Sequence, residues 1–273
     1  MAAQNLAKKI DSLRYLARPE SDPQPSELPE IIQKIRARTP ARLLNGRAGT
    51  SYRTQTQMEL REAHAAARDA VRTELRLEDI FDSAMIDKWG LFVVSTRAAN
   101  KNEYLLRPDL GREFTPGSAA EIARRCPARP AMQIVLGDGL SVTAVRVQVP
   151  QLLPLLLEGA SARGWSIGQL FLVRYCRVGI LNAIGNLLQP NLAIMLIGER
   201  PGLATAESLS AYMAYRPQTG HTDAQRNLIS NIHARGVGPQ EAATRILNLS
   251  ARMMALQMSG FNVREQPLEI HDI

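Results

Sequence analysis

Short apolar runs alternate with helix-type patterns along the second half of the chain. Three runs are unbroken enough to be strands buried on both faces: Met132 to Leu136, Gln169 to Tyr175 and Leu192 to Ile197. The segments between and after them show helical spacing: Gln151 to Arg163, Val178 to Leu188 and Pro239 to Met258. Strands that alternate with helices indicate an α/β fold with a parallel sheet and right-handed crossovers.

The first half of the chain is predicted to be mainly helical. Strong helix formers at helical spacing predict a helix of about five turns over Gln57 to Leu75. Two short strands are expected at Leu91 to Thr96 and Tyr104 to Leu106, around a turn that contains Asn100 and Asn102.

The amino-terminal residues have the pattern of a separate segment. Leu6, Ile10, Leu13 and Ala17 recur at helical spacing, which predicts a short amphipathic helix for docking or targeting. The stretch Arg18 to Glu30 carries four prolines and is typical of an extended linker. A first helix packed on the body is the alternative. We therefore expect three parts: residues 1–27 as helix and linker, 28–115 as a helical region with short strands, and 116–273 as the sheet domain.

The third apolar run stops abruptly at Gly198, Glu199 and Arg200. Pro201 cannot continue a hydrogen-bonded ladder and Gly202 permits a positive φ, so the backbone can turn sharply there. Because ligands gather at the carboxyl ends of strands in open α/β sheets, we predict a functional loop. A solvated turn that holds an ion pair is the alternative.

Charge and cysteine content narrow the class of protein. The net charge of the 273 residues is +7, but the basic residues are scattered, lysine is absent after Lys101, and only 5% of residues are aromatic, which disfavours nucleic-acid binding. An acidic partner subunit or a phosphorylated cofactor would use the same arginine surplus. Cys126 and Cys176 lie far apart without a CxxC partner, which disfavours a disulfide framework and a zinc site. Without a secretory or long apolar segment, we expect a cytoplasmic protein that does not enter a membrane.

One glycine pair has part of a nucleotide-binding pattern. Gly137, Asp138 and Gly139 follow a predicted strand and precede Ser141, a candidate helix cap, as in a dinucleotide-binding turn. The third glycine of that motif would fall at Val142, and without it the approach to a pyrophosphate is not assured. A stand-alone nucleotide-dependent oxidoreductase is therefore an alternative function.

A second partial motif surrounds a histidine. Asn231 to Gly236 nearly matches the DxHxxG signature by which some corrinoid enzymes bring a histidine to cobalt. Asparagine stands where the orienting aspartate would be, so His233 is expected to be a structural or interface residue. The histidines show no metal spacing, and HExxH and GxSxG motifs are absent. Glu78 and Asp79 fall in a predicted loop as solvated charges, so we assign no catalytic and no metal-binding residue.

Eight blocks occur in a fixed order across roughly residues 28 to 263: GRAGTSYRTQTQ (Gly46 to Gln57), HAAARDAV (His64 to Val71), LLRPDLGR (Leu105 to Arg112), GDGLS (Gly137 to Ser141), VRYCRV (Val173 to Val178), IGERPGL (Ile197 to Leu203), ESLSAY (Glu207 to Tyr212) and ISNIH (Ile229 to His233). Together they resemble the small subunit, or light chain, of ethanolamine ammonia-lyase. The pairing of IGERPGL with ISNIH is specific to that family.

The resemblance implies a subunit of an adenosylcobalamin-dependent carbon–nitrogen lyase that converts ethanolamine to acetaldehyde and ammonia, with radical chemistry supplied by the cofactor. In that family a large subunit with a TIM barrel holds ethanolamine, and the small subunit's Rossmann-like domain closes over the corrinoid at the interface. A hetero-oligomer with six copies of each subunit is implied, in the cytoplasm or within a bacterial microcompartment. A non-catalytic recruitment scaffold is a third possible function.

The family's cofactor contacts fall on three residues of this chain: Val178, Glu199 and Leu228. Glu199 is suited to accept hydrogen bonds from amide and hydroxyl groups of the corrin periphery or the adenosyl ribose, and Val178 would supply an apolar wall. Many relatives carry cysteine at the position of Leu228, so only a backbone or van der Waals contact would persist there. Gly179 to Leu188 lacks acidic residues that relatives carry, which weakens the expected polar contacts near Val178.

Overall fold

The computed structural model describes residues 29–39, 41–202 and 204–265. Its internal contacts divide the chain into two units, one of residues 1–69 and 202–205 and the other of residues 70–201 and 206–273. The predicted amphipathic helix and nearly all of the proline-rich linker lie outside the described residues. The proposed division at residues 27 and 115 stays a prediction.

The first unit contains α2 (Glu30–Ala37) and most of α3 (Thr54–Arg72). The Arg36 guanidinium orders the segment that follows α2, because it donates to the carbonyls of Leu43 at 3.1 Å and Leu44 at 3.0 Å. α3 confirms the helix predicted from Gln57, with its start three residues earlier, at Thr54.

The second unit is organised around a six-stranded sheet in the order β1-β3-β2-β4-β5-β6. The strands are β1 (Phe92–Ser95), β2 (Met132–Gly137), β3 (Phe171–Arg174), β4 (Leu192–Gly198), β5 (Leu209–Tyr215) and β6 (Asn227–Ile232). The first four in this numbering run parallel, whereas β5 is antiparallel to β4 and β6 is antiparallel to β5. The α/β class is confirmed, as are the three strands predicted from apolar runs and the short strand predicted at Leu91 to Thr96. The expectation of a purely parallel sheet is wrong, because β4 is followed by β5 and β6 without a crossover α-helix in the described residues, and each of these two strands runs antiparallel to the one before it.

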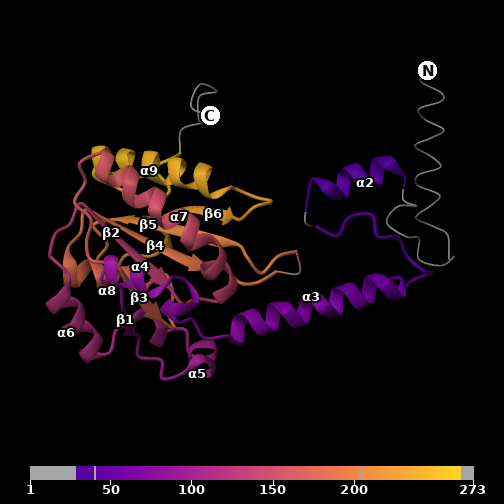
Figure 1. The fold of residues 1–273 in the computed structure, drawn as a ribbon, viewed down its shortest axis with the longest axis horizontal. Helices are drawn as coiled ribbons and strands as arrows, with labels where there is room; N and C mark the ends of the chain where they lie inside the picture. Colours follow the sequence, from indigo (N-terminus) through magenta and orange to yellow (C-terminus); the bar gives the residue numbers. More distant parts are fainter. Residues whose placement is uncertain (1–28, 40, 203, 266–273) are drawn as a thin grey trace, which may run out of the picture. The chain divides into compact units, whose positions relative to one another are not determined.

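Helices cover both faces of the sheet (Figure 1). α7 (Val142–Ala162) and α9 (Pro239–Leu256) pack together on one face, while α6 (Pro116–Arg125) and α8 (Ile180–Leu188) pack on the other. Every residue of β2 and β4 is buried, which explains why these strands are continuous apolar runs. Each face therefore has its own hydrophobic core.

The segment Tyr104–Leu106 is helical, so its prediction as a strand is wrong. It belongs to α5 (Lys101–Leu106), which begins after Asn100. The Asn100 side chain accepts a hydrogen bond from the backbone N–H of Glu103 at 3.0 Å. Asparagine in this position is a strong helix cap, and that local interaction outweighs the β preference of a Tyr-Leu-Leu run.

Local side-chain caps also set the starts of other helices. Ser141 accepts a hydrogen bond from Ala144 N–H at 3.2 Å, which confirms it as a cap and starts α7 nine residues before the predicted Gln151. α7 continues through Pro150 and Pro154, although each ring removes one backbone donor. The remaining short helices are α4 (Ser83–Lys88), which Asp82 caps, and the 3₁₀ turns η2 (Leu77–Asp79), η3 (Leu110–Arg112) and η4 (Asp223–Gln225).

The packing of α8 against the loop after β5 depends on one glycine. A Cβ on Gly185 would lie 1.7 Å from the carbonyl oxygen of Pro217, whereas Gly117 in α6 has open space around it. Alanine at Gly185 should destabilise the fold by about 1–3 kcal/mol because the overlap exceeds the helix-propensity gain. Gly117→Ala is the matched control and should cost nothing. Urea unfolding of both variants measures the difference, and equal stability of the two would contradict the packing described.

Candidate functional site

The strand order reverses beside β2. The chain leaves β2 for β3 on one side and later returns to β4 on the other side, with α7 and α8 on opposite faces. In open α/β sheets the crevice outside the carboxyl ends of such strands is the usual ligand site. At this point Gly139 lies in the loop after β2, and Glu199 directly follows the end of β4. The backbone N–H of Leu140 donates to the carbonyl of Gly198 at 3.2 Å, so the loop after β2 contacts the end of β4. The predicted functional loop is thus at the expected edge of the sheet.

Glu199 is held in place by a backbone hydrogen bond to the residue before β5 and by the side chain of a tyrosine in β5. Its backbone N–H donates to Ser208 O at 3.1 Å, and its Oε1 accepts a hydrogen bond from the Tyr212 hydroxyl at 3.2 Å. Burial, followed by the negative charge of Glu199, raises the pKa of Tyr212 to about 12, so the hydroxyl stays protonated and able to donate. Arg200 is exposed. The carboxylate is therefore oriented by Tyr212, not by an ion pair with its neighbour.

Leu228 lies beside this pair. In the antiparallel pairing of β5 with β6 it is directly opposite Tyr212, and side chains opposite each other share a face of the sheet. Its side chain is 43% exposed, so an apolar surface is available next to the Tyr212 ring. Glu199 and Leu228, far apart in sequence, are brought together through Tyr212.

Val178 follows β3 and lines a cavity of about 580 Å³. Val178 and Tyr212 are both partly buried and pack against the same hydrophobic core. The cavity is lined by the start of α8, by residues 219–223 and Arg226, and by Arg112 and Glu113. The three predicted contacts are therefore on the face of the sheet that α8 covers.

Several residues that line this cavity have a buried polar atom without a hydrogen-bond partner. Arg177 Nε, His221 Nδ1 and Arg226 Nε are buried without a hydrogen-bond partner in the described protein. The rest of the Arg226 guanidinium is engaged, because it forms an ion pair with Asp223 and donates to Asn182 Oδ1 at 3.0 Å. Buried polar atoms usually have partners, but these three atoms are shielded from solvent, so they identify no ligand for the cavity.

Tyr212 and Arg226 were not found by sequence reasoning. Tyr212 carries no motif of its own, and only the pairing of β5 with β4 and β6 places it between Glu199 and Leu228. The available signal was the ESLSAY block, which contains Tyr212 but does not say which of its residues faces the site. Arg226 is similar, since its contact with α8 depends on the fold.

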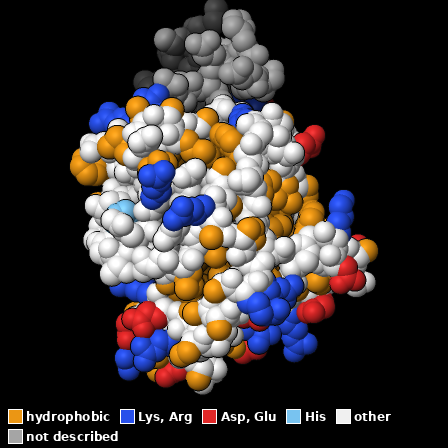
Figure 2. Space-filling model, turned by 90° about the vertical axis from the view of Figure 1, so that its left-hand side faces the viewer, with side chains coloured by type: hydrophobic (Ala, Val, Ile, Leu, Met, Phe, Trp, Pro, Cys, Tyr) orange, Lys and Arg blue, Asp and Glu red, His pale blue; other side chains and the backbone are white. Residues whose placement is uncertain are grey.

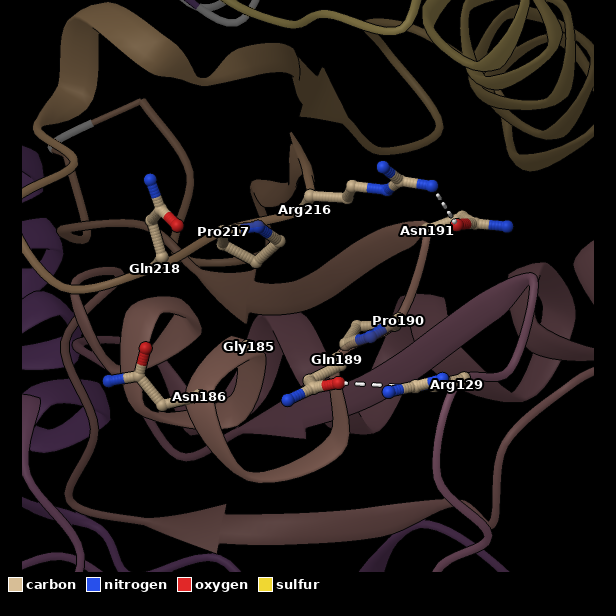
Figure 3. Close-up of a pocket in the computed structure, with 9 residues that line it drawn as sticks. All are labelled: Arg129, Gly185, Asn186, Gln189, Pro190, Asn191, Arg216, Pro217 and Gln218. Carbon is tan, nitrogen blue, oxygen red and sulfur yellow. Dashed lines mark hydrogen bonds between the residues drawn. The ribbon is translucent and has the colours of Figure 1, made fainter.

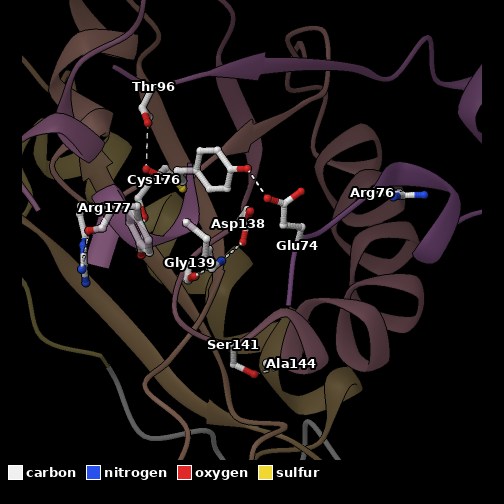
Figure 4. Close-up of polar contacts among 12 residues, drawn as sticks. Glu74, Arg76, Thr96, Asp138, Gly139, Ser141, Ala144, Cys176 and Arg177 are labelled. Atoms are coloured by element: carbon white, nitrogen blue, oxygen red, sulfur yellow. Dashed lines mark hydrogen bonds and ion pairs between the residues drawn. The ribbon is translucent and has the colours of Figure 1, made fainter. Parts of the chain in front are cut away.

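The Gly137–Gly139 turn is filled by protein. The Asp138 carboxylate is buried and forms an ion pair with Lys101 at 2.5 Å (Figure 4). A Cβ on Gly139 would lie 2.4 Å from Ile197 Cγ1, so this glycine permits contact with β4. The turn therefore serves packing between strand ends, and the structure offers no support for a pyrophosphate there.

His233 has both ring nitrogens engaged within the protein. Nε2 is 2.7 Å from Asn231 Oδ1, and Nδ1 accepts from Arg235 N–H at 3.2 Å. This arrangement makes Nε2 the donor and leaves no lone pair for a metal. Burial, assisted by Arg235, lowers the pKa of the buried His233 ring. The residue is structural, as expected.

A second cavity, of about 530 Å³, lies at the other end of β4 (Figure 3). Its two guanidiniums are engaged by neighbouring amides: Arg129 Nε is 3.2 Å from Gln189 Oε1, and Arg216 Nη2 is 3.3 Å from Asn191 Oδ1. None of the predicted contacts lines it. We assign these contacts to the ordering of the loops around the start of β4.

Other candidate chemistry stays absent from the described residues. Both cysteines are free and buried, and burial raises the pKa of Cys126 to about 11. In the described ranges there is no group of side chains that could hold a metal ion and no helix long and apolar enough to cross a membrane. Glu78 and Asp79 are exposed in η2, where Asp79 Oδ2 accepts a hydrogen bond from the backbone N–H of Arg76 at 3.3 Å. On the face in Figure 2, basic side chains lie in separate groups among hydrophobic ones.

A sequence model described as ethanolamine ammonia-lyase light chain matches residues 29–264. The chain belongs to this light-chain family. It is 40% identical over 235 residues to the ethanolamine ammonia-lyase small subunit of Clostridium perfringens, covering 86% of this chain and 78% of the relative. The small subunit of Clostridium acetobutylicum is 39% identical over 235 residues, covering 86% of this chain and 95% of the relative. That of Clostridioides difficile is 40% identical, with coverages of 86% and 78%.

Membership of the light-chain family confirms the resemblance carried by the sequence blocks. The chain is a subunit of a lyase of ethanolamine catabolism, and a small subunit implies a large one. The three contact residues themselves stay predictions.

The lowered pKa of His233 gives this light chain a pH-dependent stability. Because the unfolded ring has the higher pKa, near 6.5, the contribution is present above about pH 6.5 and is lost as the pH falls through the folded pKa. The wild type should lose up to about 1.4 kcal/mol more per pH unit than His233→Gln in that window. Urea unfolding between about pH 7.5 and 5 measures this. His64→Gln, on the exposed surface of α3, is the control, and a wild-type slope in His233→Gln would refute the assignment.

Proposed function

We propose that this light chain forms one wall of the adenosylcobalamin site of ethanolamine ammonia-lyase, at an interface with the large subunit that binds ethanolamine. The observation that carries the proposal is the convergence of Glu199, Tyr212 and Leu228 on the face of the sheet that also carries the cavity of Val178. In this proposal, residues 116–273 act as a Rossmann-like domain whose loops face the corrinoid.

The residues present fit an amide-rich corrinoid. Glu199 offers a fixed carboxylate for the amide and hydroxyl donors of a corrin or ribose, and Tyr212 keeps it from rotating. Val178 and Leu228 supply apolar surface, and the basic residues Arg177 and Arg226 line the same cavity as Val178. When bound, adenosylcobalamin supplies radical chemistry, while this chain binds, orients and shields it from water.

Two departures from the family pattern bear on cofactor affinity. Leu228 offers no thiol, but its exposed side chain can still pack against a corrin edge. The non-acidic segment Gly179 to Leu188 leaves Arg226 with Asn182 as its partner on α8. Asn182 carries no charge, and the Arg226 guanidinium forms its ion pair with Asp223 instead.

The rival functions have weaker support. A nucleotide-dependent oxidoreductase needs the Gly137 turn, which is occupied by the Lys101–Asp138 pair. A recruitment scaffold would rest on the first 27 residues, which lie outside the described structure. We propose a cytoplasmic hetero-oligomer with six copies of each subunit. In this proposal, any placement of the complex in a bacterial microcompartment depends on the amino-terminal segment.

The dependence on a partner is tested by reconstitution. The purified light chain should show no ethanolamine deamination with adenosylcobalamin, because the described residues hold no catalytic set. Activity should appear when the large subunit is added. A steady-state assay for acetaldehyde measures both, and robust deamination by this chain alone would contradict the proposal.

Glu199 is tested by truncation within the reconstituted complex. Glu199→Ala should weaken adenosylcobalamin binding about tenfold to a hundredfold, the usual loss for hydrogen bonds to a charged group, with the fold intact. Equilibrium dialysis measures the affinity, and circular dichroism checks the fold. Glu158→Ala, an exposed glutamate of α7, is the matched control. An unchanged affinity in Glu199→Ala would remove Glu199 from the site.

A further inference from the structure

A lysine and an aspartate form a buried ion pair at the carboxyl edge of the sheet. Lys101 Nζ is 2.5 Å from Asp138 Oδ1, and their side chains are only 7% and 1% exposed. The same ammonium donates to the carbonyl of Gly139 at 3.0 Å and lies over the rings of Tyr104 and Tyr175. The pair joins α5 to the loop after β2, where Figure 4 shows Asp138.

Burying this ion pair costs more free energy than an apolar contact that would hold the same short helix. Taking both charges out of water costs several kcal/mol, and Asp138 Oδ2 is buried with no partner among the described residues. Lys101 is also the first residue of α5, where the helix dipole disfavours a cation. Burial raises the pKa of the Asp138 carboxyl, and Lys101 opposes that shift. Hydrophobic residues of similar size would fill the space at lower cost.

One line of contacts runs from the pair to Val178. The backbone carbonyl of Asp138 accepts from Cys176 N–H at 3.0 Å. The Tyr104 hydroxyl, from α5, donates to the carbonyl of Cys176 at 3.1 Å, and Arg177 lies with its guanidinium 4.3 Å from the Tyr104 ring centre. Val178 is the next residue. The pair and α5 therefore fix the backbone that presents Val178.

A second line of contacts runs from the pair to Glu199. Lys101 binds the carbonyl of Gly139, and the next residue, Leu140, donates its N–H to Gly198 O at 3.2 Å. A Cβ on Gly198 would lie 1.9 Å from the Ser141 carbonyl oxygen, so the two loops touch through their backbones. Glu199 follows Gly198 directly. A shift of the Gly139 loop would therefore be transmitted to Glu199.

We propose that the Lys101–Asp138 pair is a positioning device that sets the spacing between the Val178 and Glu199 loops for the corrinoid. This inference rests on the proposed function, because it assumes that both loops contact the cofactor. The pair itself does not touch the corrinoid; its carboxylate and ammonium are almost fully buried. Its role is to link the ends of β3 and β4 to one point on α5.

A positioning role and a stabilising role make different predictions. If the pair only stabilises the fold, a variant with apolar residues at both positions should have both the stability and the cofactor affinity of the wild type. If the pair positions the loops, the same variant should have wild-type stability but a weaker affinity for the cofactor. The reason is that a nonpolar contact lacks the directed bonds from Lys101 to Asp138 and Gly139.

The experiment uses reconstituted complexes with the large subunit and adenosylcobalamin. The variants are Asp138→Asn, the double variant Lys101→Met with Asp138→Leu, and a control double variant, Arg245→Met with Glu265→Leu, which removes an ion pair of α9. Equilibrium dialysis gives the dissociation constant, thermal unfolding gives stability, and amide hydrogen exchange at Leu140 and Glu199 reports loop order.

We expect the Lys101–Asp138 double variant to unfold near the wild-type temperature while it binds adenosylcobalamin roughly tenfold more weakly and exchanges the Leu140 amide faster. The control pair should leave affinity unchanged. Wild-type affinity in a stable double variant, or in Asp138→Asn, would overturn the positioning role. Glu199→Ala measured alongside separates the two failures: if it too binds normally, the proposed site is wrong, whereas weakened binding in Glu199→Ala alone refutes only the positioning role.

Discussion

The backbone contact between the end of β4 and the loop after β2 is the constraint on which the candidate site depends. Gly139 and Gly198 allow this contact, since a side chain at either position would overlap Ile197 or the Ser141 carbonyl. Once these two strand ends touch, the sheet edge presents Glu199 in a fixed direction. The same edge is where the strand order reverses, the place at which open α/β sheets usually bind ligands.

The antiparallel strands β5 and β6 place two side chains near Glu199 that a purely parallel sheet would not place there. β5 returns along β4 and brings Tyr212 within hydrogen-bond distance of Glu199, and β6 places Leu228 opposite that tyrosine. A carboxylate at a strand end would otherwise rotate freely in solvent. Here its orientation is set by a donor from a neighbouring strand, which is the kind of preorganisation that limits the entropy lost on binding.

Physical patterns in the sequence predicted the central layers well and the periphery poorly. The fully buried strands β2 and β4 are recognisable in the sequence as apolar runs, and the loop that begins at Glu199 was predicted from the end of the run that forms β4. α5 was mistaken for a strand since its start depends on the Asn100 cap, and β5 and β6 were missed because their pairing is a property of the folded chain. Val178 and Leu228 came from the family resemblance, and Tyr212 came only from the structure.

The central claim is that a light chain with no catalytic residues of its own supplies one wall of a cofactor site shared with a larger subunit. The most direct measurement is a structure of the reconstituted complex with adenosylcobalamin bound. The account predicts the Glu199 carboxylate within hydrogen-bond distance of the corrin periphery or the adenosyl ribose, with Val178 and Leu228 in van der Waals contact with the cofactor. A corrinoid held entirely by the large subunit, with Glu199 facing solvent, would contradict it.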